Sequence, residues 1–502
     1  MRQASPLFTP VVWEGDHFKV LDETLLPWSM EYITVKEVGE ALQAVKEMKT
    51  RAFGQVLTFL YAAALVARRY SGKGHEPLRE GITHLAQEFT KARPTFGFEG
   101  LAQSFFGSFQ QDSAEEKVGS WVEGKLHEFV ATILHRRDRR ARRAAKLLPN
   151  PCRLLTHCNI SGELVAIAQH SRAMGKDLQV IATETRPYLQ GSRLTAWEFA
   201  HAGFRVALIP DCAVAQVMAK GEVNAVLVGS DRCAQNGDII NKVGTYPLAL
   251  IAKEYGVPFY ALVQDPGLLA AGGDVPIEER PVAELVTFQG RSLTPEGIHG
   301  RYPAFDLTPA SLVSHLIGFD WAFSPEAFRQ RFQNASPLLK KRKKKRERLI
   351  LLYGVPRRDS YTYLSHALKA EQARSVLVPE MRPELWGAHV VTRELLERNI
   401  PATVISDNMM GTLFAQEEVR RLYLFYEQLG EKGALGIAGS LLAALLARAH
   451  GVPVELLASG EAQYSPLDRS ISTFLGQRVS PDGVTIYPLT RETIPWSLFS
   501  KN

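Results

Sequence analysis

Short runs of apolar residues alternate with longer helix-like segments in the middle of the chain. Each run is bounded by polar or turn-forming residues, as buried strands are, and the segments between them have apolar residues at three- or four-residue steps. Strands alternating with helices predict a parallel sheet with helices on both faces, and such sheets bind ligands at the carboxyl ends of their strands. The predicted strands cover residues 153–155, 178–182, 204–209, 225–228 and 258–263.

The first 150 residues have a different pattern. Two short apolar segments, 11–14 and 17–21, flank a Gly-Asp pair and predict a β-hairpin. Beyond the hairpin, apolar residues recur at helical spacing, so we expect a mostly helical lobe. A Pro-Asn-Pro segment at 149–151 marks the boundary with the sheet.

The chain also contains an internal repeat, which has to be identified before a fold is predicted. Residues 184–191 (ETRPYLQG) recur as residues 380–387 (EMRPELWG), and Asp211 recurs as Asp407 at the same offset of 196. We therefore expect an α/β protein with an N-terminal hairpin and helical lobe, a Rossmann-like doubly wound parallel sheet domain and a second, homologous Rossmann-like domain. The expected boundaries are 1–150 for the hairpin and lobe, 151–333 for the first sheet domain, 334–348 for a basic linker and 349–502 for the second sheet domain.

The second copy lacks several polar side chains of the first. At the offset of 196, Cys158 falls on Gly354, Asp231 falls on Glu427, and Asn241-Lys242 falls on Ile437-Ala438. The scaffold signals are kept while the thiol and the ammonium group are lost. We therefore expect the second copy to be a degenerate partner domain.

Composition limits the class of protein. Apolar residues make up 45% of the chain and charged residues 22%, which is ordinary for a soluble globular protein. The first residues lack the apolar segment of a signal peptide, and the longest apolar run, 53–67, is too short to span a membrane. We therefore expect a cytoplasmic protein without a membrane partner. The four cysteines show no metal-ligand spacing, so we expect free thiols and no metal.

The net charge of +6 is concentrated in two basic runs, 135–146 (HRRDRRARRAAK) and 340–348 (KKRKKKRER). Such runs can bind the phosphates of nucleic acids, but they are also typical of solvated helix ends and charged linkers. Neither run contains aromatic residues on which bases would stack. We therefore do not favour nucleic acid as a partner.

Cys158, Asp211 and Asp231 each follow a predicted strand, at the edge where an open α/β sheet binds its ligand, and Cys158 and Asp231 are the candidates for catalysis. Cys158 precedes helix-forming residues, and a helix N-terminus favours the thiolate form of cysteine. Asp231 follows the run 225–228, and burial there would favour a protonated carboxyl that can act as an acid. Each residue has an ordinary alternative: a small buried side chain for Cys158 and an ion pair with Arg232 for Asp231.

Other polar residues are candidates for ligand binding. Gln190, Asn241 and Lys242 lie in loops after predicted strands, and Lys242 suits a phosphate or a developing oxyanion. Arg51 and Arg93 in the helical lobe suit bidentate phosphate recognition, although solvation is the default for a single arginine. No GxGxxG segment follows a strand, so a dinucleotide is not indicated.

These motifs, in this order, resemble one family. Residues 11–330 are similar to the S-methyl-5-thioribose-1-phosphate isomerases of methionine salvage. The same superfamily contains archaeal ribose-1,5-bisphosphate isomerases and the non-catalytic regulatory subunits of the exchange factor for translation initiation factor 2. The resemblance is carried by Trp13-Glu14, Leu21-Asp22, Arg93-Pro94-Thr95, Thr156-His157-Cys158-Asn159 and residues 184–197, 229–246, 276–280 and 303–309.

The resemblance implies roles for individual residues. Cys158 and Asp231 match the catalytic pair of the isomerases, which the regulatory subunits lack, and this favours an enzyme. The family's Arg-Gly-Ala-Pro loop reads Arg-Ala-Phe-Gly at 51–54, so a side chain stands where glycine lets the backbone approach the phosphate. No metal and no organic cofactor is implied. The implied substrate contacts are Arg51, Ala52, Phe53, Arg93, Gln190, Asn241 and Lys242.

We therefore expect an isomerase that converts a small phosphorylated sugar from an aldose 1-phosphate to a ketose 1-phosphate. S-methyl-5-thioribose 1-phosphate is the first expected substrate. A ribose 1,5-bisphosphate isomerase and a non-catalytic regulatory protein are the alternatives. The family commonly dimerises through its sheet domain, so we expect either a homodimer or an internal pseudo-dimer in which the second copy takes the partner's place.

Overall fold

The computed structural model describes residues 4–70, 72, 74–94, 96–108, 117–333, 347–460, 465–488 and 491–499. Thr95 and most of the basic linker expected at 334–348 lie outside the described residues. Contacts between residues divide the chain into two compact units. The first contains residues 1–147, 160–175 and 197–204, and the second contains residues 148–159, 176–196 and 205–502. The four-part division expected from the sequence stays a prediction.

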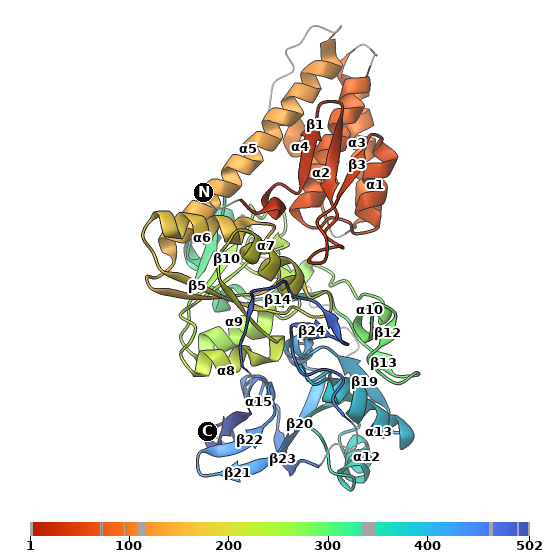
Figure 1. Ribbon diagram of the computed structural model, residues 1–502, viewed down its shortest axis with the longest axis vertical. Coiled ribbons are helices and arrows are strands. Elements are labelled where there is room, and N and C mark those ends of the chain that lie inside the picture. The colour runs from red at the N-terminus through yellow and green to blue at the C-terminus, as the bar shows by residue number, and fades with distance from the viewer. Residues whose placement is uncertain are drawn as a thin grey trace. The chain divides into compact units, whose positions relative to one another are not determined.

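The first unit joins a small antiparallel sheet to a group of helices (Figure 1). The expected hairpin is confirmed, because its two strands pair antiparallel, and a third strand extends the sheet. Buried aromatic and aliphatic side chains of the strands and helices form one core. The elements are β1 (Val11–Glu14), β2 (His17–Leu21), β3 (Tyr32–Val35), α1 (Val38–Lys46), α2 (Phe53–Arg69), α3 (His75–Ala92), α4 (Phe98–Phe106), α5 (Val118–Leu147) and α6 (Glu163–Ala173).

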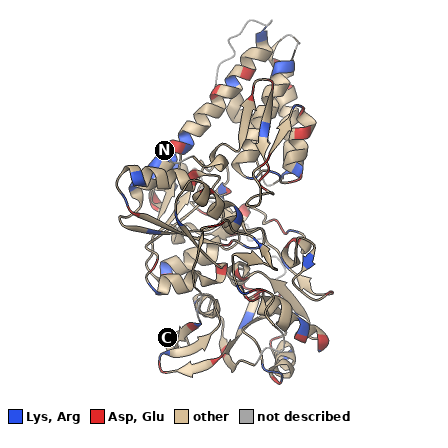
Figure 2. Cartoon of the chain, viewed as in Figure 1, with Lys and Arg blue, Asp and Glu red and all other residues tan. Residues whose placement is uncertain are grey.

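The basic run at 135–146 lies on α5, where its Lys and Arg residues are blue in Figure 2. Arg137 and Arg140 are buried and bind Glu163 on α6, with their Nε atoms 2.8 and 2.9 Å from its carboxylate oxygens. A buried carboxylate needs such partners because it has lost its hydration. This part of the run therefore joins two helices instead of forming a charged surface. Among the residues that the structure describes, no helix has both the length and the apolar character of a membrane span.

The second unit is built on two sheets in which almost all strands are parallel, the exception being β16, which pairs antiparallel with β15. The first sheet has the strand order β16-β15-β10-β7-β4-β5-β6-β26, and six of these strands follow the Rossmann order 3-2-1-4-5-6. All five strands expected from the apolar runs are present. Its strands are β4 (Cys152–Thr156), β5 (Leu178–Thr183), β6 (Val206–Ile209), β7 (Ala225–Val228), β10 (Phe259–Leu262), β15 (His315–Ile317) and β16 (Ala322–Phe323). The helices of this part of the unit are α8 (Val214–Ala219), α9 (Thr245–Glu254), α10 (Ala283–Val286) and α11 (Pro325–Phe332). Helix α7 (Ala196–His201), which follows β5 in the chain, falls almost entirely in the first unit.

The second sheet repeats this topology. Its order is β13-β19-β18-β17-β20-β23, in which the strands of the second copy follow the order 3-2-1-4-5. The expected second Rossmann-like domain is therefore present. Its elements are β17 (Leu349–Tyr353), α12 (Ser360–Ala370), β18 (Ser375–Pro379), α13 (Thr392–Glu397), β19 (Ala402–Ile405), α14 (Met410–Ala415), β20 (Val419–Tyr426), α15 (Ser440–Ala449) and β23 (Val454–Ala458).

The two sheets exchange edge strands. β13 (His299–Gly300), from the tail of the first copy, pairs in parallel with β19 of the second sheet. β26 (Thr485–Ile486), from the tail of the second copy, pairs in parallel with β6 of the first sheet. The strands to which they pair, β19 and β6, occupy equivalent positions in the two sheets. Each exchanged strand covers a sheet edge that would otherwise expose unpaired backbone groups.

Reciprocal ion pairs join the two copies. The Arg186 guanidinium binds the Glu380 carboxylate, with Nη2 2.8 Å from Oε2, and Arg382 binds Glu184 with the corresponding distance of 2.9 Å. All four side chains are at most 1% exposed. The ring centroid of Phe474 lies 4.2 Å from the guanidinium carbon of Arg186 and 4.9 Å from that of Arg382, so both cations also contact an aromatic face.

A single hydrophobic core runs through both copies and is completed by helix packing, α9 on α14 and α8 on α15. Asp306 caps the start of α9 by accepting the backbone N–H groups of Gly244 and Tyr246 at 2.7 and 3.0 Å. Glu492 caps α15 in the same way at the equivalent position of the second copy. Burial raises the pKa of both carboxyls to about 7. The capping strands are β14 (Phe305–Thr308) and β27 (Glu492–Pro495).

Replacing Arg382 by Met tests the reciprocal ion pairs. The variant leaves the Glu184 carboxylate buried without its cation, so we expect the free energy of unfolding to fall by about 3–5 kcal/mol. Urea denaturation followed by circular dichroism measures this change. The control is Arg374→Met, which removes a surface pair with Glu347 in which the arginine side chain is 77% exposed, and which should cost at most about 1 kcal/mol. Equal effects of the two variants would contradict the assigned role of Arg382.

Replacing Asp306 by Asn tests the buried cap. Ordinary Asp has a pKa of 3.8, and the folded-state pKa of Asp306 is about 7, so the wild-type chain loses stability as the pH rises between these values. The slope for one such group is about 1.4 kcal/mol per pH unit. The neutral amide removes this loss, so the stability of Asp306→Asn relative to wild type should rise from pH 4 to pH 7. Glu492→Gln should behave alike, and a pH-independent difference in both variants would be inconsistent with buried, protonated caps.

Candidate active site

The two expected catalytic residues follow neighbouring strands of the first sheet. β4 pairs in parallel with β7, with Leu154 opposite Ala225. Cys158 lies two residues beyond the end of β4, and Asp231 lies three residues beyond the end of β7. Parallel neighbours end at the same edge of a sheet, so both positions lie at the carboxyl edge, where ligands bind in this fold.

Hydrogen bonds on both sides hold the backbone of Cys158. Its φ of +67° lies in the left-handed region, which is uncommon for a residue with a side chain. The N–H group donates to Thr185 Oγ1 at 2.9 Å, and the carbonyl oxygen accepts from Thr195 Oγ1 at 2.8 Å. The surrounding loops therefore fix the direction in which the thiol leaves the chain.

Cys158 differs from the other cysteines in its accessibility. Its side chain is partly exposed, whereas Cys152, Cys212 and Cys233 are buried. Burial raises the pKa of the Cys152 and Cys233 thiols to about 12 and that of Cys212 well above its ordinary value. These three are thus inert thiols, and Cys158 is the one that a ligand at the carboxyl edge can reach.

The residue before Cys158 is a buried, neutral histidine. Burial lowers the pKa of His157 to about 4, so the ring is uncharged near neutral pH. Nε2 lies 2.9 Å from the carbonyl oxygen of Val243 and must donate to it, which leaves Nδ1 to accept from Thr183 Oγ1 at 2.7 Å. His157 therefore ties the Cys158 segment to the turn that follows β9 (Ile239–Lys242).

Asp231 is exposed, so the expectation of a buried carboxyl in a dry site is wrong for this structure. Its N–H donates to Ile240 O at 2.9 Å, and its carbonyl oxygen accepts from Gln264 Nε2 at 3.0 Å. The backbone is anchored while the side chain has access to solvent.

Asn241 and Lys242 are both buried on β9, which pairs antiparallel with β14. The Asn241 amide donates to Thr245 Oγ1 at 2.9 Å, and the Lys242 ammonium lies 4.6 Å from the ring centroid of Phe305. The Lys242 ammonium also interacts electrostatically with Asp306, where its charge opposes the rise in the pKa of that carboxyl. A joint contact of both side chains with one ligand stays a prediction.

Gln190 is 5% exposed, and its Oε1 has no hydrogen-bond partner among the described residues. A buried acceptor without a donor is costly, so this oxygen is a candidate to accept a hydrogen bond from a ligand. Gln190 directly precedes a π-helical segment, Gly191–Thr195, and such segments are frequent at functional sites. The sequence pattern does not reveal this segment, because its residues suit an ordinary helix as well.

The remaining expected contacts, Arg51, Ala52, Phe53 and Arg93, lie in the first compact unit. The Arg51 N–H donates to Glu23 at 2.9 Å. Ala52 has a φ of +41°, so alanine adopts at this position the kind of conformation that glycine adopts without strain. Phe53 packs under the guanidinium of Arg137, 3.7 Å from its ring centroid, and is therefore engaged within its own unit. Arg93 ends α3. A phosphate contact by these residues stays a prediction.

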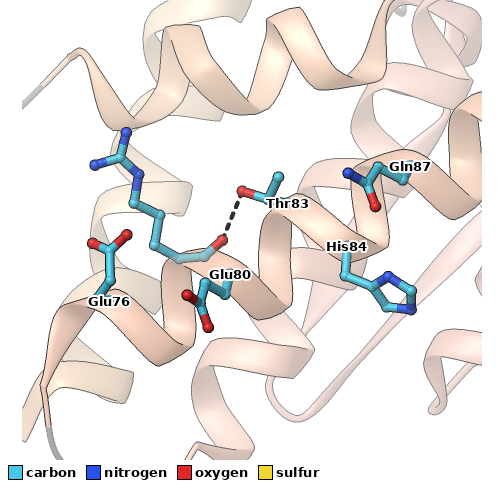
Figure 3. Close-up of a pocket in the computed structure, with 6 residues that line it drawn as sticks. Glu76, Glu80, Thr83, His84 and Gln87 are labelled. Carbon is cyan, nitrogen blue, oxygen red and sulfur yellow. Dashed lines mark hydrogen bonds between the residues drawn. The ribbon is translucent and has the colours of Figure 1, made fainter.

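A shallow hollow on the same unit is lined by residues of α3 alone (Figure 3). The dashed line in the figure is the bond from Thr83 Oγ1 to the carbonyl oxygen of Arg79, one turn earlier in the same helix. None of the candidate site residues lines this hollow, so we do not assign it to the site.

The second copy has no room for a thiol at the equivalent position. A Cβ atom on Gly354, which corresponds to Cys158, would lie 2.7 Å from the carbonyl oxygen of Phe425 and 2.8 Å from its Cβ. In the first copy the residue equivalent to Phe425 is Gly229. Phe425 thus occupies the space next to Gly354 in the second copy. Glu427, which is equivalent to Asp231, accepts a hydrogen bond from Arg491 Nε at 2.7 Å.

The expected alignment of Asn241-Lys242 with Ile437-Ala438 is wrong by one residue. The N–H of Asp231 donates to Ile240 O, and that of Glu427 donates to Leu435 O, so the hairpin is one residue shorter in the second copy. Asn241-Lys242 therefore correspond to Gly436-Ile437. The conclusion that the second copy lacks the amide and the ammonium group is unchanged. The second-copy hairpin consists of β21 (Gln428–Gly430) and β22 (Gly433–Gly436).

Comparison with known proteins identifies the relatives of this chain. A sequence model of the initiation factor 2 subunit family matches residues 54–318 and 333–460. The methylthioribose-1-phosphate isomerase of Desulforudis audaxviator is 35% identical over 324 residues, which cover 61% of this chain and 91% of the relative. The protein of the same name from Thermosipho melanesiensis is 35% identical over 325 residues, with 61% and 92% coverage.

Two solved structures are similar to the chain. The 5-methylthioribose 1-phosphate isomerase from Pyrococcus horikoshii has a TM-score of 0.58 and 28% identity, covering 66% of this chain and 97% of that one. The translation initiation factor eIF-2B subunit delta from A. fulgidus has a TM-score of 0.55 and 31% identity, covering 63% and 96%. With sequence and architecture in agreement, the chain belongs to the initiation factor 2 subunit family.

Proposed function

We propose that the chain is an aldose-ketose isomerase that converts S-methyl-5-thioribose 1-phosphate to S-methyl-5-thioribulose 1-phosphate. The relatives named methylthioribose-1-phosphate isomerase align with this chain over most of their own length, which supports this substrate. The family also contains a solved initiation factor subunit, so membership alone does not decide between an enzyme and a regulatory protein.

The observation that carries the proposal is the reachable thiol at the carboxyl edge of the first sheet. Cys158 is partly exposed, is held by hydrogen bonds through both backbone groups and follows the strand next to the one that leads to Asp231. A purely structural cysteine would be expected to be buried, as the other three are. A thiol and a carboxylate at the same edge of the sheet would suit the transfer of hydrogen between adjacent carbons.

In this reaction the C1 phosphate blocks simple opening of the sugar ring. The ring oxygen has to receive a proton, and hydrogen has to move from C2 to C1. Asp231 would donate the proton, and bound substrate would exclude water from its exposed carboxyl. Cys158 would act at the C1–C2 edge, where charge develops.

The remaining candidates would bind and orient the substrate. Lys242, Arg51 and Arg93 would bind the phosphate, and Asn241 and Gln190 would bind hydroxyl groups. The buried Gln190 Oε1, which has no donor among the described residues, supports this role because a sugar hydroxyl would supply one. We also propose a cytoplasmic location, in which the four cysteines would be kept as free thiols.

Turnover by wild type and three variants tests the proposal. Ketose formation from methylthioribose 1-phosphate, followed by NMR, is expected for the wild type. Cys158→Ala and Asp231→Asn should each lower kcat by about 10²–10⁴-fold, since each removes a group that acts on the reacting atoms. Glu427→Gln, the equivalent change in the second copy, should have no measurable effect. Product from ribose 1,5-bisphosphate alone would indicate the bisphosphate isomerase, and no product from either sugar would indicate a regulatory protein.

We also propose that the second copy takes the place of a partner subunit, so that the chain is an internal pseudo-dimer. The reciprocal ion pairs and the exchange of β13 and β26 already use the equivalent surfaces of both copies. A second chain would have to displace these contacts in order to dimerise in the same way.

Light scattering after gel filtration measures the oligomeric state. We expect a mass close to the 55.8 kDa of one chain. A mass near twice this value at micromolar concentration would contradict the pseudo-dimer and would favour the homodimer.

A further inference from the structure

A side chain of the second copy reaches the loop that supports Cys158. Asn408 follows β19 and is 2% exposed. Its Nδ2 donates to the carbonyl oxygen of Arg186 and to Asp211 Oδ2, both at 2.9 Å. Ser406 Oγ lies 2.7 Å from Asn408 Oδ1 and fixes the amide orientation, because a hydroxyl donating to the oxygen leaves the nitrogen facing Asp211.

Asp211 connects Asn408 to the backbone of the loop that supports Cys158. Its two carboxylate oxygens accept the backbone N–H groups of Thr185 and Arg186, at 2.8 and 2.7 Å. Thr185 Oγ1 in turn accepts the N–H of Cys158 at 2.9 Å. A continuous path of hydrogen bonds therefore runs from Asn408 through Asp211 and Thr185 to Cys158, buried up to Thr185 and part-buried at Cys158.

The path holds a strained part of the backbone. Thr185 has a φ of +61° and Cys158 a φ of +67°, both in the left-handed region. Such residues are strained and persist only when their surroundings fix them. Removing the amide of Asn408 would leave Asp211, a buried carboxylate, with fewer donors and free to shift with the Thr185 loop.

The path differs between the two copies. The residue equivalent to Asn408 in the first copy is Cys212, whose Sγ lies 3.6 Å from the carbonyl oxygen of Arg382. Asp407 accepts the N–H groups of Met381 and Arg382, as Asp211 does for the first copy. A thiol is a weak donor compared with an amide. The stronger donor thus faces the copy that has Cys158, and the weaker one faces the copy that has Gly354.

We propose that Asn408 is a positioning residue for the Cys158 centre, so that the second copy completes the active site of the first. The proposal rests on the proposed function, in which Cys158 acts on the substrate. It gives the degenerate copy a role in catalysis beyond burial of apolar surface. A misplacement of about 1 Å at a reacting group can cost about 10²-fold in rate.

The test compares Asn408→Ala with Cys212→Ala, its counterpart in the first copy. Both residues are buried, and both changes truncate the side chain to a methyl group. For each variant we would measure kcat and KM with methylthioribose 1-phosphate, the thermal melting temperature, and the rate at which iodoacetamide alkylates Cys158 as a function of pH, determined by mass spectrometry. Alkylation of Cys158 can be separated from that of the other thiols because these are buried.

We expect Asn408→Ala to lower kcat by about 10–100-fold with a smaller change in KM, and to shift the pH profile of Cys158 alkylation. Cys212→Ala should change neither. Equal effects of the two variants on kcat and alkylation would overturn the proposal, because the contact would then be structural only. If Asn408→Ala does not fold, Asn408→Ser, which keeps one donor, is compared with Cys212→Ala on the same criteria.

The alkylation profile separates this proposal from the proposed function. If the wild type shows no turnover, the assigned reaction is wrong, but the response of the Cys158 thiol to Asn408→Ala still reports whether Asn408 positions it. A normal profile in Asn408→Ala would overturn the positioning role even in an active enzyme.

Discussion

The second compact unit depends on two buried ion pairs that are related by the internal repeat. Arg186 binds Glu380, Arg382 binds Glu184, and all four groups are removed from water. Burying charge is unfavourable unless the partner is present in good geometry. Because each arginine finds its carboxylate on the other copy, neither copy can satisfy these groups alone. The two sheet domains are therefore parts of one folded unit, which agrees with the hydrophobic core that they share.

The same short segment serves the interface and the candidate site. In the run Glu184-Thr185-Arg186, the first and third side chains bind the second copy, whereas the middle hydroxyl accepts the N–H of Cys158. The arrangement couples the geometry of the thiol to the fit between the copies. It also gives a physical reason for keeping a second domain whose own equivalent site is filled by Phe425.

Much of the sheet architecture could be predicted from the sequence. The apolar runs identified the parallel strands β4, β5, β6, β7 and β10, because buried strands need continuous apolar sequence. The repeated Arg-Pro motif identified the second copy. The strand pattern made Cys158 and Asp231 candidates, and the resemblance gave them catalytic roles. The neighbouring strands of the structure are consistent with that choice but do not test their roles.

Other features could not be read from the sequence for identifiable reasons. The exchanged strands β13 and β26 are two residues long, which is too short to show an alternation of apolar and polar residues. The exposure of Asp231 depends on tertiary packing, which the pattern of strands does not specify. The hairpin of the second copy is one residue shorter, so the alignment of the two copies shifts by one residue after it. A constant offset taken from another part of the chain cannot reveal such a shift. The contact of Asn408 with Asp211 joins distant parts of the chain and depends on the packing of the two copies.

The strand exchange affects what happens when one sheet domain is produced without the other. β6 and β19 are outer strands that are each paired with a short segment belonging to the opposite copy. Separating the two halves would strip both of these edges at once, and bare strand edges recruit other chains. Fragments corresponding to a single sheet domain would thus self-associate on expression, and the duplication cannot be reversed by simple truncation.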